Sequence, residues 1–240
     1  MLRILIRSKT PNAILQIYRP IRNLNRQLFR RFYDNRNAAV AKNLIISRFP
    51  QLSSKLNQGV VLDLGANVGD FTHACLDLGF SVIAVEPHPS ALKYLQRRMG
   101  KKPNVQILPV GVSDVEGKTF LYTHPFHNND PIATSIAAST VSEKFSRGVM
   151  RYEIEVITME KIMSNNQVFE IVKIDIEGAE MLLVDSIIHF APKIKKLLVE
   201  THERFMLSTT DSEKYHEALN KLNSFIHENN LEKEWLTDWI

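Results

Sequence analysis

Residues 61–70 read Val61-Leu-Asp-Leu-Gly-Ala-Asn-Val-Gly-Asp70, an apolar run that ends in a glycine-containing turn. The turn leads into the apolar-rich segment from Phe71 to Leu78, which has the character of a helix. A strand, a glycine turn and a helix in this order form the nucleotide-binding corner of doubly wound α/β folds. These ten residues therefore predict an α/β fold with a mostly parallel sheet and a ligand site at the end of the first strand.

The turn differs from a dinucleotide-binding fingerprint. When G-x-G-x-x-G is aligned on Gly65, the second and third glycines fall on Asn67 and Asp70. The Asn67 side chain hinders the approach of a pyrophosphate, and Asp70 repels it at the entrance of the helix. A ligand without phosphates, carrying a positive sulfonium and ammonium, suits the acids around this turn, which favours S-adenosylmethionine as the cofactor.

Outward from this corner, short apolar runs alternate with helix-like segments, as in a parallel sheet covered by helices on both faces. Two strand-like pieces, Thr119–Tyr122 and Tyr152–Ile157, flank a loop-like insertion from His124 to Arg151 that we expect near the substrate. Only Trp235 to Ile240 remains for a sixth strand, with no obvious room for a closing antiparallel one. The five predicted strands of the sheet are Val60–Leu64, Ser81–Val85, Val105–Leu108, Ile171–Asp175 and Leu197–Glu200.

Three acids occupy the ends of successive strands, where a doubly wound sheet forms one cleft. Glu86 is placed to accept hydrogen bonds from the ribose hydroxyls, and Asp114 to accept one from the adenine amino group. Asp63 lies in the first strand, just before the turn. Structural alternatives stay open, because Glu86 could cap a helix and Asp114 could close an Asx turn. The predicted cofactor-binding residues are Asp63, Gly65, Asn67, Gly69, Glu86 and Asp114.

Five motifs follow one another between Val60 and His202: Asp63-Leu-Gly-Ala-Asn-Val-Gly69 followed by Thr72, Val85-Glu-Pro-His-Pro89, Asn104-Val105 leading to Val112-Ser-Asp114, Lys173-Ile-Asp-Ile-Glu-Gly-Ala-Glu180 and Val199-Glu-Thr-His202. Through these motifs the chain resembles the FkbM family of methyltransferases from Val60 to His202. The resemblance implies a Rossmann-like class I methyltransferase fold, S-adenosylmethionine as methyl donor, and O-methylation of sugars, polyketides or other secondary metabolites. One departure is Thr158-Met-Glu160, where the family commonly has Thr-Leu-Asp.

Methyl transfer to a hydroxyl requires the enzyme to hold the nucleophile in line and to remove its proton. The predicted catalytic residues are Asp175, Glu177, Glu200 and His202, since the fourth and fifth strands are adjacent in the expected order. A neutral His202, with the ordinary histidine pKa of about 6.5, is the most readily available base at physiological pH, while a carboxylate orients the hydroxyl.

A less favoured alternative assigns Asp175 and Glu200 to one divalent metal ion, with or without His202 as a third ligand, and leaves the identity of the metal open. We expect Glu180 to face solvent on the helix that begins near Ala179. Lys173 is expected to form a salt bridge or to line the strand end.

The basic charge belongs to the N-terminal segment. Residues 1–48 hold 11 of the 30 Lys and Arg residues but one of the 26 acids, so they carry +10 and the remainder −6. Apolar residues from Ile14 to Phe32 recur at three- and four-residue steps opposite a row of arginines, which predicts a basic amphipathic helix. We therefore divide the chain into a basic helical arm, residues 1–48, and a methyltransferase domain, residues 49–240.

The sequence also gives expectations for the location and the partners of the protein. Its single cysteine, Cys75, lies in an apolar segment, and neither a signal peptide nor a membrane span is recognisable, so we expect a cytoplasmic protein. The arm permits peripheral contact with an anionic membrane. A small-molecule or glycan acceptor is the expected partner, and a homo-oligomer stays open.

Two other functions compete with methylation of a small molecule. Nucleic-acid methylation is disfavoured, because the chain has no Asn/Asp-Pro-Pro-Tyr-like base pocket and no aromatic stacking platform. A binding module that keeps the methyltransferase fold without turnover is the remaining alternative.

Overall fold

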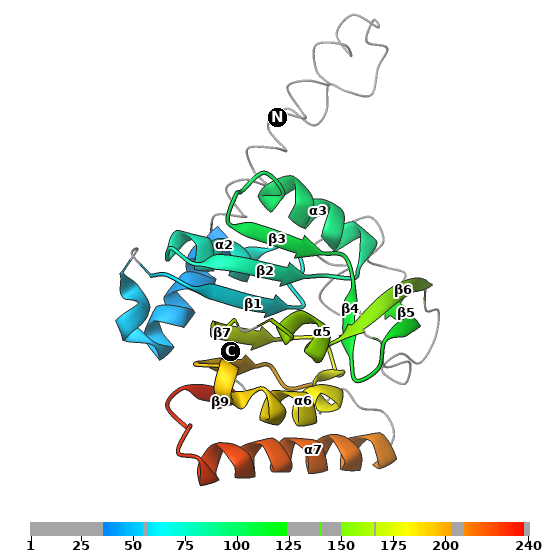
Figure 1. The fold of residues 1–240 in the computed structure, drawn as a ribbon. Helices are drawn as coiled ribbons and strands as arrows, with labels where there is room; N and C mark the ends of the chain where they lie inside the picture. Colours follow the sequence, from blue (N-terminus) through cyan, green and yellow to red (C-terminus); the bar gives the residue numbers. More distant parts are fainter. Residues whose placement is uncertain are drawn as a thin grey trace, which may run out of the picture.

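The computed structural model describes residues 36–54, 57–123, 140, 150–165, 167–202 and 209–237. Its main sheet has six parallel strands in the order β3-β2-β1-β7-β8-β9, with helices on both faces (Figure 1). The order reverses between β1 and β7, which makes the carboxyl ends of these two strands a topological switch point. The strands are β1 (Val60–Leu64), β2 (Ser81–Val85), β3 (Val105–Leu108), β7 (Phe169–Ile174), β8 (Leu197–Val199) and β9 (Trp235–Thr237).

Successive residues of the central strands pack against different helices. Val61 and Ile171 join one buried cluster with α2, α3 and the helix at residues 36–48, while Leu62 and Val172 join another with α5, α6 and α7. Because both faces are buried, the strands read as nearly continuous apolar runs. The helices are α2 (Asp70–Asp77), α3 (Pro89–Met99), α5 (Met159–Met163), α6 (Val184–His189) and α7 (Thr209–Glu228), with 3-10 helices η1 (Pro50–Ser53), η4 (Glu180–Leu183) and η5 (Ala191–Lys193).

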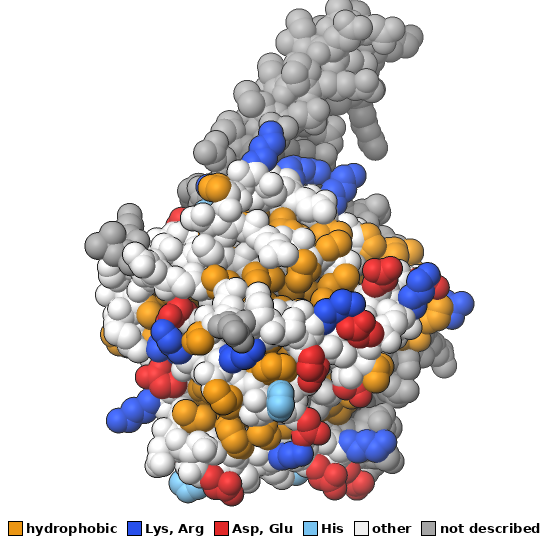
Figure 2. Space-filling view, viewed as in Figure 1, with side chains coloured by type: hydrophobic (Ala, Val, Ile, Leu, Met, Phe, Trp, Pro, Cys, Tyr) orange, Lys and Arg blue, Asp and Glu red, His pale blue; other side chains and the backbone are white. Residues whose placement is uncertain are grey.

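The two faces are covered unequally. On the face shown in Figure 2, hydrophobic side chains gather over β2 and β3. Ile83 of β2 and Leu108 of β3 are only partly buried against the cluster that includes α5, α6 and α7, whereas Val172 and Ile174 of β7 are fully buried in it. The described helices therefore cover the β7 side of this face more completely than the β2–β3 side.

A second, three-stranded sheet lies beside the main one. β4 (Gly111–Ser113) pairs in parallel with β6 (Met150–Thr158), which pairs in antiparallel fashion with β5 (Gly117–Thr123). The two strand-like pieces predicted here are confirmed and are longer than expected, while β4 was not predicted as a strand. Most of the predicted insertion, His124 to Arg151, lies outside the described residues.

The predicted ends of the main strands need small corrections. β7 begins two residues earlier than expected and ends at Ile174, so Asp175 follows the strand directly. Likewise, β8 ends at Val199, and Glu200 follows it. The sixth strand is confirmed over Trp235–Thr237 and is parallel to β8; within the described residues the main sheet contains no antiparallel strand.

The predicted arm is described only in its last part. The amphipathic helix expected over Ile14 to Phe32 lies outside the described residues, and a helix is seen at residues 36–48. Ala38 and Ile45 of this helix are buried, and Ile45 packs in the same cluster as Phe71. The boundary proposed at residue 48 remains a prediction. Cys75 is a buried free thiol, as expected.

Among the helices that the structure describes, none has the length and apolar character needed to span a membrane.

Candidate active site

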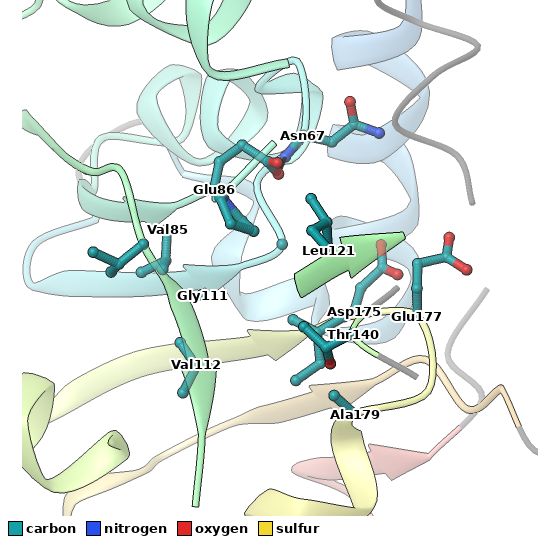
Figure 3. A pocket seen from close by; sticks show the side chains of 14 residues that line it. Asn67, Val85, Glu86, Gly111, Val112, Leu121, Thr140, Asp175, Glu177 and Ala179 are labelled. Atoms are coloured by element: carbon teal, nitrogen blue, oxygen red, sulfur yellow. Dashed lines mark hydrogen bonds between the residues drawn. The ribbon is translucent and has the colours of Figure 1, made fainter. Parts of the chain in front are cut away.

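A cavity opens at the switch point of the main sheet (Figure 3). It combines residues that follow β1, β2 and β3 with residues that follow β7, so it joins both halves of the sheet. A second cavity extends toward the helix at residues 36–48 and shares Gly65, Asn67 and Asp175 with the first. The first cavity is lined by Gly65, Asn67, Val85, Glu86, Pro87, Val110, Gly111, Val112, Leu121, Thr140, Asp175, Ile176, Glu177 and Ala179.

The glycine turn is built for close contact between β1 and β7. Gly65 has a φ of +76°, and a Cβ atom placed on it would lie 1.8 Å from the backbone oxygen of Asp175. At Gly69 (φ +87°), a Cβ atom would lie 2.6 Å from the Leu95 side chain. Both glycine positions of the predicted turn therefore require glycine. Between them, Asn67 adopts a left-handed conformation with a φ of 51°.

Glu86 ties the glycine turn to the end of β2. Its Oε2 accepts a hydrogen bond from the Asn67 backbone N–H at 2.8 Å, and its Oε1 accepts one from the His88 backbone N–H at 2.7 Å. Burial raises the pKa of Glu86 to about 7, against the opposing effect of these hydrogen bonds. Because each carboxylate oxygen can accept a second hydrogen bond, Glu86 can still receive ligand hydroxyls from the cavity it lines.

Asp63 lies behind the turn and lines neither cavity. It is fully buried, it accepts a hydrogen bond from the Thr72 hydroxyl at 2.6 Å, and it faces Lys173 at 3.5 Å. Lys173 also donates to the Gly65 carbonyl at 2.9 Å and pairs with Asp175 at 3.0 Å. Burial lowers the pKa of Lys173, but Asp175 and Asp63 raise it by more, so the lysine stays charged. Asp63 and Lys173 thus support the turn from inside the sheet.

Asp114 is set apart from the other predicted cofactor residues. It follows β4, is exposed, and accepts a hydrogen bond from the Ser113 hydroxyl at 3.0 Å. It does not line the cavity, which is bordered at this end by Val110, Gly111 and Val112. The predicted contact between Asp114 and an adenine amino group remains a prediction.

The four predicted catalytic residues converge around the imidazole of His202. Its Nε2 atom lies 3.9 Å from Asp175 Oδ1, 3.5 Å from Glu177 Oε2 and 3.8 Å from Glu200 Oε1. His202 is buried, whereas the three carboxylates are partly accessible. Glu177 has a φ of 58°, a conformation that side chains rarely adopt and that recurs at functional sites. The structure therefore brings this group together; Asp175 and Glu177 line the cavity, and Glu200 and His202 lie beside them without lining it.

Glu180 stands behind His202, and its predicted exposure to solvent is wrong. It is 3% exposed, and its Oε1 lies 2.8 Å from His202 Nδ1. Its carboxylate also accepts hydrogen bonds from the backbone N–H groups of Ile176 and Gly178 and from the Tyr215 hydroxyl. After Gly178 the chain forms the 3-10 helix η4 instead of a regular α-helix, which turns Glu180 inward to satisfy these donors.

The surroundings of His202 shift its pKa. Burial lowers the pKa, but the hydrogen bond to Glu180 and the charges of Glu180, Glu177 and Asp175 outweigh that effect and raise it. The protonated form of His202 therefore extends to higher pH than that of an unperturbed imidazole. The pKa of Glu200 is raised by burial and by repulsion from Asp175.

The comparisons with known proteins agree with this arrangement. Residues 63–229 match the methyltransferase FkbM domain, and the chain therefore belongs to this family of methyltransferases. The expected resemblance and Rossmann-like fold are confirmed. The chain is also similar to the hexuronic acid methyltransferase AglP of Haloferax volcanii, with 26% identity over 147 residues that cover 60% of this chain and 56% of that protein. The chain thus matches little more than half the length of this relative.

Proposed function

We propose that the protein is an S-adenosylmethionine-dependent O-methyltransferase that acts on a hydroxyl of an acidic sugar. The family gives the methyltransferase class, and the similarity to a hexuronic acid methyltransferase favours a sugar acceptor. The observation that carries the proposal is one cavity with Glu86 at one end and the carboxylates of Asp175 and Glu177 at the other.

Three features of the cavity support S-adenosylmethionine as the cofactor. Glu86 lies at the end of β2, where its free lone pairs can accept hydrogen bonds from ribose hydroxyls. Val85 and Val112 supply apolar contacts for the adenine ring. The Asn67 Oδ1 atom is buried and has no hydrogen-bond partner in the described part of the chain, so it can accept from the ammonium of the methionine part. When bound, the cofactor supplies an activated methyl group.

The reaction end is suited to hold an acceptor hydroxyl and take its proton. Lys173 pairs with Asp175 Oδ2 and leaves Oδ1 turned toward the His202 side of the cluster. Asp175 is thus fixed in orientation, with one oxygen available for the acceptor. Glu200 follows the adjacent strand β8 and provides a second carboxylate at the same place. One carboxylate orients the hydroxyl while the other accepts the proton.

The proposal is tested by a methyl-transfer assay with purified protein. Isotope-labelled S-adenosylmethionine would be incubated with glucuronate- and galacturonate-containing glycans and with their neutral counterparts, and products examined by mass spectrometry for one added methyl group. We expect methylation of the uronate-containing acceptors. Tighter binding of NAD than of S-adenosylmethionine would overturn the cofactor, and tight cofactor binding without turnover on any acceptor would favour a binding module.

A further inference from the structure

We propose that Asp175, Glu200 and His202 form a binding site for one divalent cation of the Mn²⁺ or Mg²⁺ type. Only the role of the ion, activation of the acceptor hydroxyl, rests on the proposed function; its binding does not. The observation behind the proposal is that each residue offers one ligand atom, and these three atoms lie within 4.8 Å of one another.

The spacing of the ligand atoms suits a single ion. A Mn²⁺ or Mg²⁺ ion lies about 2.1 Å from each ligand, so ligand atoms on opposite sides are about 4.2 Å apart and adjacent ones about 3 Å. The observed distances from His202 Nε2, 3.9 Å to Asp175 and 3.8 Å to Glu200, fall in this interval. Both carboxylates are partly exposed, so small rotations can close the site around an ion.

Glu180 supplies an independent indication, because it lies on the far side of the imidazole. Histidines that bind metals commonly donate their other ring N–H to a carboxylate, which fixes the ring and directs the ligand nitrogen toward the ion. Glu180 Oε1 lies 2.8 Å from His202 Nδ1, and the Glu180 carboxylate is itself held by Tyr215 and two backbone N–H groups. This support orients Nε2 toward Asp175 and Glu200.

The charges of the cluster also favour a bound cation. The carboxylates of Asp175, Glu177, Glu180 and Glu200 approach His202, and Lys173 pairs with one of them. Even with His202 protonated, carboxylates outnumber cationic side chains in this set. An acidic sugar would be repelled by such a cluster, whereas a divalent ion would attract its carboxylate or hydroxyl and lower the pKa of the hydroxyl.

The donor set narrows the choice of metal. Carboxylate oxygens suit Mg²⁺, Ca²⁺ and Mn²⁺, and an imidazole nitrogen suits softer divalent ions. Mn²⁺ accepts both kinds of ligand and is paramagnetic, so it is the appropriate probe. Glu177, with its Oε2 atom 3.5 Å from His202 Nε2, is close enough to add a fourth ligand or to accept a proton from a ligand on the metal.

The test measures Mn²⁺ binding to the full chain without cofactor, by electron paramagnetic resonance and isothermal titration. We expect one ion per chain, with affinity reduced at least tenfold by Asp175→Asn and by Glu200→Gln. Glu180→Gln should weaken binding about 10- to 100-fold while all three ligands remain. Asp185→Asn, which removes an exposed acid paired with Lys221, is the matched control and should change nothing. Thermal unfolding of each variant separates lost ligands from lost folding.

The outcomes separate this proposal from the proposed function. Absence of Mn²⁺ binding, or binding that these ligand variants leave unchanged, overturns the metal site even if the protein methylates sugars. Stoichiometric binding that the ligand variants abolish supports the site even if no acceptor is methylated. If both proposals hold, chelator should stop methyl transfer, and Mn²⁺ or Mg²⁺ should restore it.

Discussion

The two ends of the cavity are held together in different ways. At the end where we propose that the cofactor binds, the cofactor end, the Glu86 carboxylate is bound by the backbone N–H groups of Asn67 and His88. At the opposite end, the proposed reaction end, His202 is surrounded by the side-chain carboxylates of residues that follow β7 and β8. The first end depends on backbone donors, and the second on side-chain charges that the pairing of β7 with β8 brings together. The cavity therefore has one end held by backbone hydrogen bonds and another end with a cluster of closely spaced charges.

Lys173 links the two ends, and its removal should have the largest effect. It contacts the Gly65 carbonyl at the turn and the carboxylates of Asp63 and Asp175. Lys173→Met leaves two acids without their buried cation, which typically costs about 3–5 kcal/mol of folding free energy. Chemical denaturation measures the loss. The control is Lys161→Met, which removes an exposed pair with Glu116 and should cost less than about 1 kcal/mol. Equal losses of unfolding free energy in the two variants would show that the buried contacts of Lys173 do not stabilise the fold across the two ends of the cavity.

Asp175→Asn should damage only the reaction end. The variant keeps the shape of the side chain but removes its charge, so we expect turnover to fall about 100-fold or more while S-adenosylmethionine affinity stays near that of the native protein. Steady-state kinetics and cofactor titration separate the two effects. Asp77→Asn, an exposed acid that pairs with His73 on α2, is the control. A variant that turns over at the native rate would mean that the reaction centre lies elsewhere.

Glu86→Ala should damage only the cofactor end. Loss of a charged hydrogen-bond acceptor typically costs about 1.5–3 kcal/mol, so we expect cofactor affinity to fall roughly 10- to 100-fold. Turnover at saturating cofactor should change far less, and Mn²⁺ binding at the reaction end should not change. Because Glu86 also anchors the Asn67 and His88 N–H groups, unfolding of the variant must be measured alongside. A loss of turnover with unchanged cofactor affinity would reverse the assignment of the two ends.

The main sheet could be predicted because its evidence is local. Strands such as β1 and β2 read as apolar runs that end in glycine or charged residues. The short strand β4 was missed, because Gly111–Ser113 is three residues long and has the composition of a turn. The parallel pairing of β9 with β8 could not be predicted, because it depends on the path of the chain after α7.

Some features of the site could likewise be predicted from the sequence, and others could not. The convergence of Asp175 and Glu200 follows from adjacent strands, whose ends must meet at one edge of a parallel sheet. The role of Glu180 could not be predicted, because it depends on a 3-10 turn and on the hydroxyl of Tyr215, 35 residues away. Tyr215 is buried, so its hydroxyl needs a hydrogen-bond partner, and Glu180 provides one.

The smallest predicted effect is the dependence of cofactor affinity on pH. Burial raises the pKa of Glu86 to about 7, so at pH 6 most of the free protein carries a neutral Glu86, which is a poorer acceptor for ribose hydroxyls than the carboxylate. Cofactor affinity should therefore fall as the pH drops below about 7, approaching tenfold per pH unit at the acidic side. Titrations from pH 5.5 to 8.5 measure the slope, and Glu86→Gln, which does not titrate, should remove it.

The same group sets a matching slope in the stability of the free protein. In the unfolded chain Glu86 has its ordinary pKa of about 4.3, so between that pH and about 7 the folded state binds the extra proton. Its contribution to the unfolding free energy is fully present below about pH 4.3 and is lost as the pH rises through about 7. Denaturation of the native protein and of Glu86→Gln across this interval isolates the contribution as the difference between the two curves. A difference between the two curves that does not change with pH would mean that Glu86 stays ionised in the folded protein. The carboxylate charge would then be present before the cofactor binds.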